Sequence, residues 1–449
     1  MNIYIMLFII LLYLSFSYVA SNRDIMEPAV LLVTGYLIAC VSCIYNIDNW
    51  GVDMHANTVV LLSVGIICFV LGDAFSCALQ KKHLSKNEMS QPHYIYVSDA
   101  KTVFFVLFYI VVLVLAIKDM ISVAGGWMGT LNSTMNEYRA AFSYNDVRTS
   151  TLVVQLQKIC KGSAYVYLYI FFNNFWVSKS TGKAKPIIGN IKYLLPVITY
   201  AILTLFRSGR LNIIMIMVAG LFYFYFIWHR IVGWNRVISW KFVKRLIIAF
   251  VVFCVVFFVT REMVGRQNKS TFVDYLTMYL GGSFQLLDQF MENSIDTISG
   301  YESFPGILMS FRKLGLYDQY IRKSLEFRTT PTGVYLGNIY TGIRRFYHDY
   351  SMLGVVVMQF LYGYLFGSLY KKIQNIRNLD TRKLSFVIIY GTLLFAPLTQ
   401  AMEDHFWIDL SVGFLIELII IRLCVFFVME FRIGSFKLIR RRWNEEENR

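Results

Sequence analysis

The sequence predicts an all-α protein that crosses a membrane many times. Of its 449 residues, 57% are hydrophobic and only 16% are charged, whereas about a quarter of the residues in a soluble domain are charged. The apolar residues gather in runs of about 20, the length that an α-helix needs to cross a bilayer. Both observations are typical of a polytopic integral membrane protein.

Eleven apolar runs are candidate membrane-spanning helices. They cover residues 3–20, 27–46, 57–78, 102–118, 158–177, 190–206, 211–228, 246–260, 351–370, 384–400 and 407–428. No obvious internal repeat relates these runs, and no Gly/Ser-rich linker separates them into groups. We therefore expect a single transmembrane domain over residues 1–449 that ends in a basic tail at 429–449.

The positions of lysine and arginine predict the orientation of the chain. They cluster around residues 81–86, 179–185, 230–245 and 371–383 and in the tail, and such clusters mark cytoplasmic segments. With eleven helices, these connections alternate with acidic or mixed ones, which predicts an outer N-terminus and a cytoplasmic C-terminus. The net charge of +15 does not indicate a nucleic-acid partner, because the basic residues lie in short clusters between apolar runs.

Two of the predicted outer connections are long loops, at residues 119–157 and 261–350. Loops of this length in a compact membrane domain are usually functional. The second loop alternates apolar runs, at 272–287 and 304–316, with charged residues. We therefore expect amphipathic or re-entrant helices that lie at the outer membrane interface.

The second loop is rich in arginine, which binds phosphate through a planar fork of donors. Basic residues generally prefer the cytoplasmic side, so an arginine-rich outer loop runs against this preference. The enrichment in arginine therefore favours an anionic ligand. The alternative is a solvated face on which arginines pair with the acids of the loop. The seven arginines are Arg261, Arg266, Arg312, Arg322, Arg328, Arg344 and Arg345.

A short outer turn, Arg207-Ser208-Gly209-Arg210, holds two more arginines at the ends of adjacent predicted helices. The helix that begins at Leu211 points its N-terminus outward, where its dipole favours an anion. Arginines at helix ends also reach toward lipid headgroups, which is the alternative interpretation. Lys158 and Lys161, at the outer end of the fifth helix, either contact the same anion or anchor the interface.

A histidine and an acid adjoin at the entrance of the ninth predicted helix. Either His348 or Asp349 could accept a proton from an attacking hydroxyl group. The alternative for Asp349 is an N-cap of the helix that follows. A second polar turn, Glu403-Asp404-His405, either joins this site or is only a turn.

The motifs of several enzyme classes do not occur in the sequence. It contains no Walker A, GxSxG or HExxH motif, and the outer histidines lack metal-ligand spacing. The one CxxC, Cys40 to Cys43, lies inside an apolar run. We expect neither a metal nor a cofactor.

The second half of the chain contains three motifs: Asn338-Ile339-Tyr340-Thr341, Asp349-Tyr350-Ser351-Met352-Leu353-Gly354 and Gly363-Tyr364-Leu365-Phe366-Gly367. They resemble those of the Wzy-type oligosaccharide repeat-unit polymerases, the bacterial O-antigen and capsule polymerases. Ser351 stands where glycine is commoner in that family. The Ser208-Gly209-Arg210 turn also resembles the family, and the similarity in topology extends over the whole chain.

The resemblance implies a GT-C-like glycosyltransferase of the bacterial inner membrane that acts on the periplasmic face. It would polymerise oligosaccharide repeat units carried on undecaprenyl pyrophosphate, without a nucleotide sugar, and a chain-length regulator would be a partner. Asp349 or His348 would be the catalytic base. The expected pyrophosphate- and sugar-binding residues are Arg139, Arg207, Arg210, Arg266, Arg328, Tyr340 and Arg344.

Three other functions remain as alternatives at this point. An O-antigen ligase moves glycan from the same carrier to the lipid A core and needs a histidine in an outer loop, a role open to His348. A flippase or transporter would show internal repeats and interrupted helices around a midplane site. A membrane acyltransferase would need a histidine deep in a helix, whereas His229 adjoins a basic loop.

Overall fold

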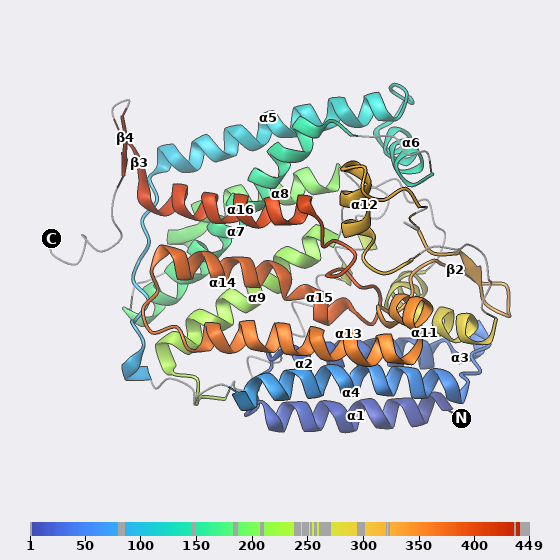
Figure 1. Cartoon of the computed structure of the whole chain (residues 1–449). Helices are drawn as coiled ribbons and strands as arrows, with labels where there is room; N and C mark the ends of the chain where they lie inside the picture. Colours follow the sequence, from blue (N-terminus) through green and yellow to red (C-terminus); the bar gives the residue numbers. More distant parts are fainter. Residues whose placement is uncertain are drawn as a thin grey trace. The chain divides into compact units, whose positions relative to one another are not determined.

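The computed structural model describes residues 2–79, 86–144, 149–182, 187–206, 211–237, 271–293, 301–319, 321, 324–434 and 437–440, with six isolated positions between 244 and 259. Every long element in this part of the chain is an α-helix (Figure 1). The chain folds into two compact units, each assembled from three separate pieces of sequence.

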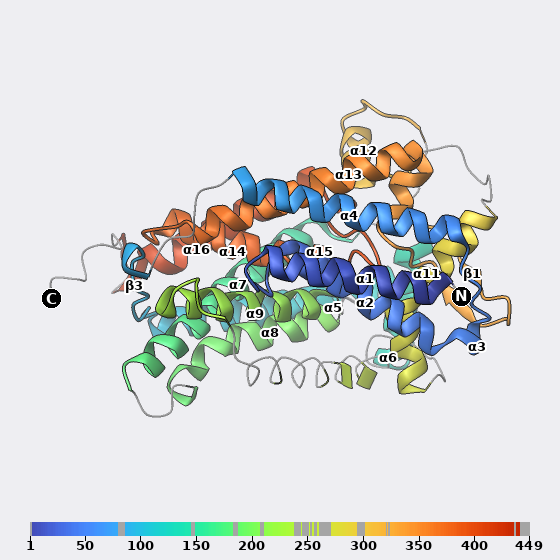
Figure 2. The same cartoon turned by 90° about the horizontal axis from the view of Figure 1, so that it is seen from below.

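The first unit consists of Met1–Lys82, Ser270–Gln374 and Leu394–Leu415. Four of its helices, α1, α2, α4 and α13, lie side by side, and α11 packs across α2 at one end of them (Figures 1 and 2). Its elements are α1 (Asn2–Ala20), α2 (Pro28–Tyr45), α3 (Ile47–Trp50), α4 (Ala56–Leu79), α11 (Phe272–Glu292), α12 (Pro305–Lys313), β1 (Arg328–Thr329), β2 (Tyr335–Gly337), α13 (Ile343–Gln374) and α15 (Phe395–Thr399).

The second unit consists of His83–Lys269, Asn375–Leu393 and Ile416–Arg449. Helix α7 packs against α5, α8 and α9, and α14 packs against α9. Its elements are η1 (Lys86–Glu88), α5 (Asp99–Val123), α6 (Leu131–Tyr144), α7 (Thr151–Ser180), η2 (Ile188–Leu194), α8 (Leu195–Leu205), α9 (Leu211–Val232), α14 (Thr381–Leu393), most of α16 (Val412–Glu430), β3 (Phe431–Gly434) and β4 (Lys437–Arg440).

Nine helical segments in the described part of the chain are long and apolar enough to cross a membrane, so the protein is an all-α polytopic membrane protein. They match nine of the predicted runs, although α13 begins at Ile343 instead of 351 and α14 is interrupted before α15. The predicted run 158–177 lies inside α7, a more polar helix of 30 residues. Most of the run 246–260 lies outside the described residues.

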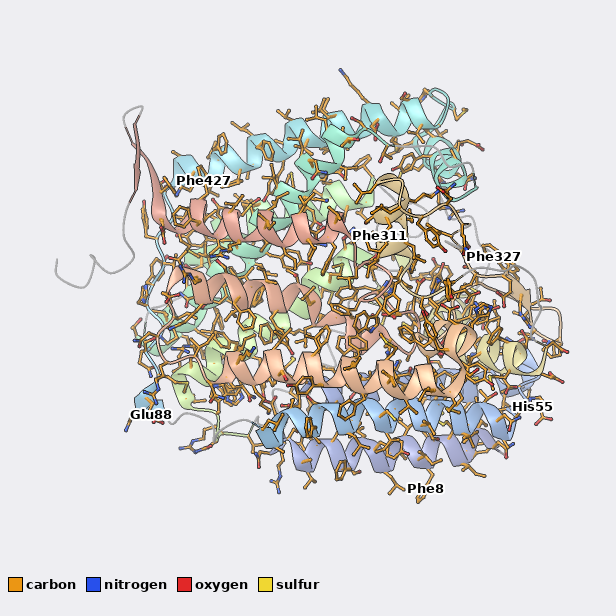
Figure 3. The ribbon with its side chains drawn as sticks, in the orientation of Figure 1. Phe8, His55, Glu88, Phe311, Phe327 and Phe427 are labelled. Carbon is orange, nitrogen blue, oxygen red and sulfur yellow. The ribbon has the colours of Figure 1, made fainter. Side chains whose placement is uncertain are left out.

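Helices α4 and α13 approach each other closely because glycines line their contact. A Cβ atom on Gly363 would lie 2.0 Å from the carbonyl oxygen of Phe69. A Cβ atom on Gly72 would lie 2.1 Å from the carbonyl oxygen of Phe360. Only glycine allows the two backbones to pack at this distance. On the opposite side, α1 exposes apolar side chains such as Phe8, which is 62% exposed (Figure 3).

Buried charges link α4 and α13 to the start of α2. The ammonium of Lys371 lies 2.9 Å from Oε2 of Glu27, and both side chains are buried. Gln374 donates a hydrogen bond to Asp24 at 2.9 Å. Asp73, also buried, accepts a 3.4 Å hydrogen bond from the backbone N–H of Ala29.

A half-buried ion pair lies in the second unit. Lys161 of α7 lies 2.6 Å from Glu417 of α16, next to the close contact between Gly162 and Ile421. Lys161 is therefore a structural partner of Glu417, and neither of the two roles expected for it is needed to explain its position.

Both apolar runs that the sequence identifies in the second long loop are helical. They form α11 and α12, and a two-stranded antiparallel hairpin of β1 and β2 follows them. The end of α12 leaves Phe311 45% and Leu314 67% exposed (Figure 3). The loop thus provides the helices, the hairpin and the connecting segments that surround the first turns of α13.

Candidate functional site

The beginning of α13 is a separate helical stretch. Ser351 interrupts the helix with φ 54° and ψ −156°, so residues 343–350 precede the long span at an angle of their own. This backbone conformation is nearly exclusive to glycine, and another residue costs about 1–3 kcal/mol there. The stretch 343–350 presents the arginines, the histidine and the aspartate on which the site is built.

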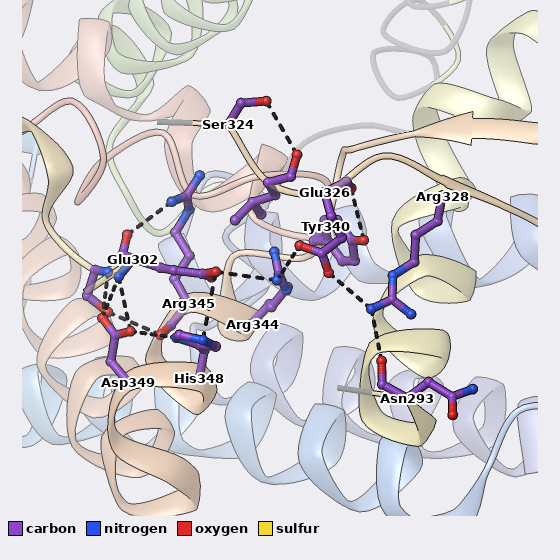
Figure 4. A network of polar contacts seen from close by, with 12 residues as sticks. Asn293, Glu302, Ser324, Glu326, Arg328, Tyr340, Arg344, Arg345, His348 and Asp349 are labelled. Carbon is purple, nitrogen blue, oxygen red and sulfur yellow. Dashed lines mark hydrogen bonds and ion pairs between the residues drawn. The ribbon is translucent and has the colours of Figure 1, made fainter. Parts of the chain in front are cut away.

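Asp349 holds a loop and a histidine in place (Figure 4). Its side chain is 1% exposed, and its carboxylate accepts hydrogen bonds from the backbone N–H groups of Glu302 at 3.0 Å and Ser303 at 2.6 Å. Its Oδ1 also lies 2.8 Å from Nδ1 of His348. Asp349 therefore attaches the 301–304 segment to α13, which explains its burial better than the N-cap role considered from the sequence.

His348 is oriented by this contact. Because an ionised carboxylate only accepts hydrogen bonds, Nδ1 carries the proton and Nε2 of the neutral ring is the basic atom. Nε2 lies 3.9 Å from Oε1 of Glu302, and 31% of the side chain is exposed. Of the two candidate bases, His348 has the more exposed side chain, and Asp349 holds it in place.

Arg344 lies behind the histidine in a buried cluster (Figure 4). Its Nη2 lies 2.7 Å from Oε2 of Glu326 and 3.4 Å from Oε1 of Glu302. The guanidinium carbon lies 4.2 Å from the ring centroid of Tyr340 and 4.3 Å from that of Phe290, both within cation–π range. Two acids and two aromatic rings thus compensate the burial of this cation.

Glu326 joins Arg344 to a second arginine. Its Oε1 lies 3.2 Å from Nη2 of Arg328, whose guanidinium also donates to the carbonyl oxygens of Gln289 at 2.8 Å and Asn293 at 3.0 Å. The hydroxyl of Tyr340 donates to the carbonyl oxygen of Glu326 at 3.1 Å. Burial, with a smaller effect of Glu326, raises the pKa of Tyr340, so its hydroxyl remains a donor.

Arg345 and Asp404 form the other side of the cluster. Nη1 of Arg345 donates to the carbonyl oxygen of Glu302 at 3.0 Å. Asp404, 1% exposed, accepts the backbone N–H groups of Phe406 at 3.1 Å and Trp407 at 3.0 Å. Burial raises the pKa of Asp404 to about 7, although Arg345 and the two N–H groups act in the opposite direction.

The structure brings together five of the residues that the sequence predicts for the site, all in the first unit. They differ from the expectation in one respect: Arg344 and Arg328 are paired with acids, and Arg344 is 1% exposed. Arg139 lies in the second unit, on α6, where it donates to Asn136 at 3.2 Å. The five residues are Arg328, Tyr340, Arg344, His348 and Asp349. The other predicted residues, Arg207, Arg210 and Arg266, lie outside the described residues.

Sequence reasoning missed the acids of this site. Glu302 and Glu326 lie 42 and 18 residues before Arg344, and no periodicity connects them to it. The nine acids of the arginine-rich loop 261–350 were the available signal, and they pointed only to solvated pairs.

One group of potential metal ligands occurs among the described residues, away from this cluster. Oxygens of Glu27 and Asp73 and the sulfur of Cys77 lie within 4.8 Å of one another. The ammonium of Lys371 already supplies a positive charge to Glu27 at 2.9 Å. Glu27 of this group thus belongs to the ion pair with Lys371.

No protein-family model, curated protein sequence or solved structure matches the chain in the comparisons made with each.

Proposed function

We propose that the protein is a membrane glycosyltransferase that polymerises oligosaccharide repeat units carried on undecaprenyl pyrophosphate. One observation supports this above all: a partly exposed histidine is held by a buried carboxylate beside two buried arginines. A general base can activate the acceptor hydroxyl. Nearby cationic side chains can stabilise an anionic leaving group. In this proposal the site faces the periplasm from a bacterial inner membrane, with a periplasmic N-terminus and a cytoplasmic C-terminus.

The proposed reaction is a single displacement at the anomeric carbon of the donor glycan. The acceptor hydroxyl oxygen forms a bond to this carbon, and its proton passes to Nε2 of His348. The bond from the carbon to the pyrophosphate oxygen breaks, and its electron pair leaves with undecaprenyl pyrophosphate. The glycan is thereby transferred to the incoming unit, and neither a nucleotide sugar nor a redox step is needed.

The arginines supply the anion-binding part of this proposal. Arg344 holds two carboxylates, and Glu326 is shared with Arg328. A phosphate presents the same kind of paired, charged oxygen atoms to a guanidinium as a carboxylate does. On binding, the pyrophosphate oxygens of the donor would replace the carboxylate of Glu326 at the arginines. In the absence of substrate, this carboxylate occupies the proposed phosphate position.

The backbone at Ser351 supports the resemblance to repeat-unit polymerases. The family pattern favours glycine at this position, and Ser351 adopts a conformation that favours glycine, with φ 54°. The preceding motif residue Asp349 and the earlier motif residue Tyr340 both contribute to the cluster around Arg344. The motifs are thus connected by contacts as well as by sequence order.

The experiment that tests the proposal is polymerisation by purified protein in lipid nanodiscs, supplied with the lipid-linked repeat unit of the host strain. Products are sized on a gel. We expect long polymer from the parent protein and from the control His93→Ala, whose imidazole belongs to the second unit. Asp349→Ala should leave only single repeats at normal protein levels. Full-length polymer from Asp349→Ala would show that the role given to the His348–Asp349 pair is wrong.

The exposed His348 also favours a second candidate, an O-antigen ligase. The two functions use the same donor and differ in the acceptor. In a deletion strain, loss of a ligase leaves long chains on the carrier lipid, whereas loss of a polymerase leaves single repeats. We expect single repeats.

A further inference from the structure

A cavity of about 620 Å³ opens in the first unit beside the arginine cluster. Three stretches line it: residues 51–55 before α4, residues 285–293 of α11 and its end, and residues 327–335 of the β1–β2 hairpin. His55 and Phe327, both labelled in Figure 3, belong to this lining. Arg328 lines the cavity and also contacts Glu326, so the cavity adjoins the cluster described above.

The polar lining consists mainly of groups that accept hydrogen bonds. It includes the carboxylates of Asp53, Asp288 and Glu292 and the side-chain amides of Gln285 and Gln289. Gln285 is 2% exposed, and its Oε1 has no hydrogen-bond partner among the described residues. A buried acceptor without a partner costs free energy, so a hydrogen-bond donor of a ligand would be favourable at this oxygen.

Two aromatic rings form an exposed platform at the same cavity. The rings of Phe327 and Tyr335 are stacked, with centroids 6.1 Å apart and planes at 10°. They are 46% and 57% exposed, although their faces are apolar. Flat apolar faces beside hydroxyl-binding acceptors match a sugar ring, which has C–H groups on its face and hydroxyls around its edge.

The charge of the lining selects among ligands. Three carboxylates and one arginine line the cavity. An added phosphate or uronate would be repelled by these carboxylates. Hydroxyl and ammonium groups are donors, and they form charge-assisted hydrogen bonds with carboxylates.

A second histidine–aspartate pair lies at the cavity. Asp288, with 4% of its side chain exposed, accepts the backbone N–H of His55 at 2.9 Å and the hydroxyl of Thr58 at 2.6 Å. Its Oδ2 lies 3.0 Å from Nδ1 of His55, whose side chain is 48% exposed. Asp288 therefore fixes the ring and leaves Nε2 of His55 for a ligand.

We propose that this cavity binds a saccharide without negative charge, either neutral or amine-bearing, through the Phe327–Tyr335 platform and the carboxylates of the same lining. That this saccharide is the end of the acceptor repeat unit rests on the proposed function. The arrangement would place the acceptor on one side of Arg328 and the donor pyrophosphate on the other.

The test is saturation-transfer NMR on the full chain in nanodiscs, with methyl glucoside, glucosamine and glucuronate as separate probes. We expect signals from the first two and a signal about fivefold weaker from glucuronate, as one like charge at a few ångströms produces. Tyr335→Ala should remove the transfer to the sugar ring protons. The matched control is Tyr301→Ala, which removes another exposed, stacked tyrosine of the same unit.

Asp53→Asn combined with Glu292→Gln provides an independent check, because it should bring the glucuronate signal up to that of methyl glucoside. Equal signals from all three probes in the parent protein, or unchanged signals in Tyr335→Ala, would overturn the inference. Binding is measured without turnover. A protein that binds these sugars but forms no polymer contradicts only the proposed function, and a protein that polymerises without this binding contradicts only the cavity.

Discussion

Two histidine–aspartate pairs in the first unit share one geometry and differ in their surroundings. In each pair a buried carboxylate holds Nδ1, at 2.8 Å in His348–Asp349 and 3.0 Å in His55–Asp288. In each pair Nε2 lies 3.9 Å from a glutamate. However, the first pair adjoins buried arginines, whereas the second opens into a cavity lined by carboxylates.

This contrast shows that the charged groups around a histidine–aspartate pair determine which reaction its imidazole can support. An imidazole beside guanidinium groups can take a proton while negative charge develops on a leaving group that those guanidiniums stabilise. An imidazole among carboxylates is suited to hydroxyl groups and disfavours an anionic leaving group. The pairs therefore divide between donor chemistry and acceptor binding in our proposal. One prediction below tests that division directly, and three test the structure around the first pair.

The largest expected effect concerns the contribution of Arg344, beside the His348–Asp349 pair, to stability. Arg344→Met leaves buried Glu302 without its arginine and half-buried Glu326 with Arg328 alone, which should lower the free energy of unfolding by about 3–5 kcal/mol. Thermal melting of the detergent-solubilised protein measures this loss. Lys372→Met is the control, because this lysine is exposed on the same helix. Equal melting temperatures for the two variants would mean that the cluster contributes nothing to the fold.

The next effect separates the two histidines directly. His348→Ala should slow glycan transfer at saturating substrate by about 100-fold or more, the range for loss of a general base. His55→Ala should raise the acceptor concentration needed for half-maximal rate and leave the maximal rate nearly unchanged. Initial rates in nanodiscs at varied acceptor concentration measure both. The division fails if His55→Ala shows the greater loss of maximal rate.

The third effect concerns the carboxyl group of Asp404, which lies near Arg345. Its pKa of about 7 is above the ordinary value of 3.8, so the folded protein binds this proton more tightly than the unfolded chain does. The contribution of Asp404 to the free energy of unfolding should therefore fall by about 1.4 kcal/mol per pH unit as the pH rises from 4 to 7. Asp404→Asn should remove this contribution from melting curves, whereas exposed Asp318→Asn should retain it. An Asp404→Asn variant with the same pH dependence as the parent protein contradicts the prediction.

The smallest effect lies in the backbone that carries the first pair. Ser351→Gly should raise the free energy of unfolding by about 1 kcal/mol, because glycine relieves the strain at φ 54°. Ser368→Gly, in a regular turn of the same helix, should lower it by about 0.5 kcal/mol. Melting temperatures of the two variants compare these changes, and a shift in the same direction for both would exclude strain at Ser351.

The sequence predicted the spanning helices well and their irregular ends poorly. An apolar run such as 57–78 is helical because the bilayer leaves the backbone no other partner, and the structure has α4 at Ala56–Leu79. Residues 343–350 are polar, and their helical turn depends on contacts with the 301–304 segment. Such contacts leave no pattern in the local sequence, so the start of α13 was predicted eight residues late.

The site was predictable only where its residues follow one another. Tyr340, Arg344 and His348 lie on one short stretch, so a motif could find them. The acids that neutralise Arg344, and the pairing of His55 with Asp288 across 233 positions, arise only when the chain is folded. Single-sequence reasoning identifies residues capable of the chemistry, whereas their protonation and exposure are set by partners that are distant in sequence.

The ion pair between Glu27 and Lys371 has a consequence for the synthesis of the protein. The two residues are 344 positions apart. At a synthesis rate of about 5–20 residues per second, Lys371 leaves the ribosome about 17 to 70 s after Glu27. Until α13 is synthesised, its residues cannot cover Glu27 and Asp73, so the burial of these two acids is completed late in synthesis. A translation pause before Lys371 would prolong this state.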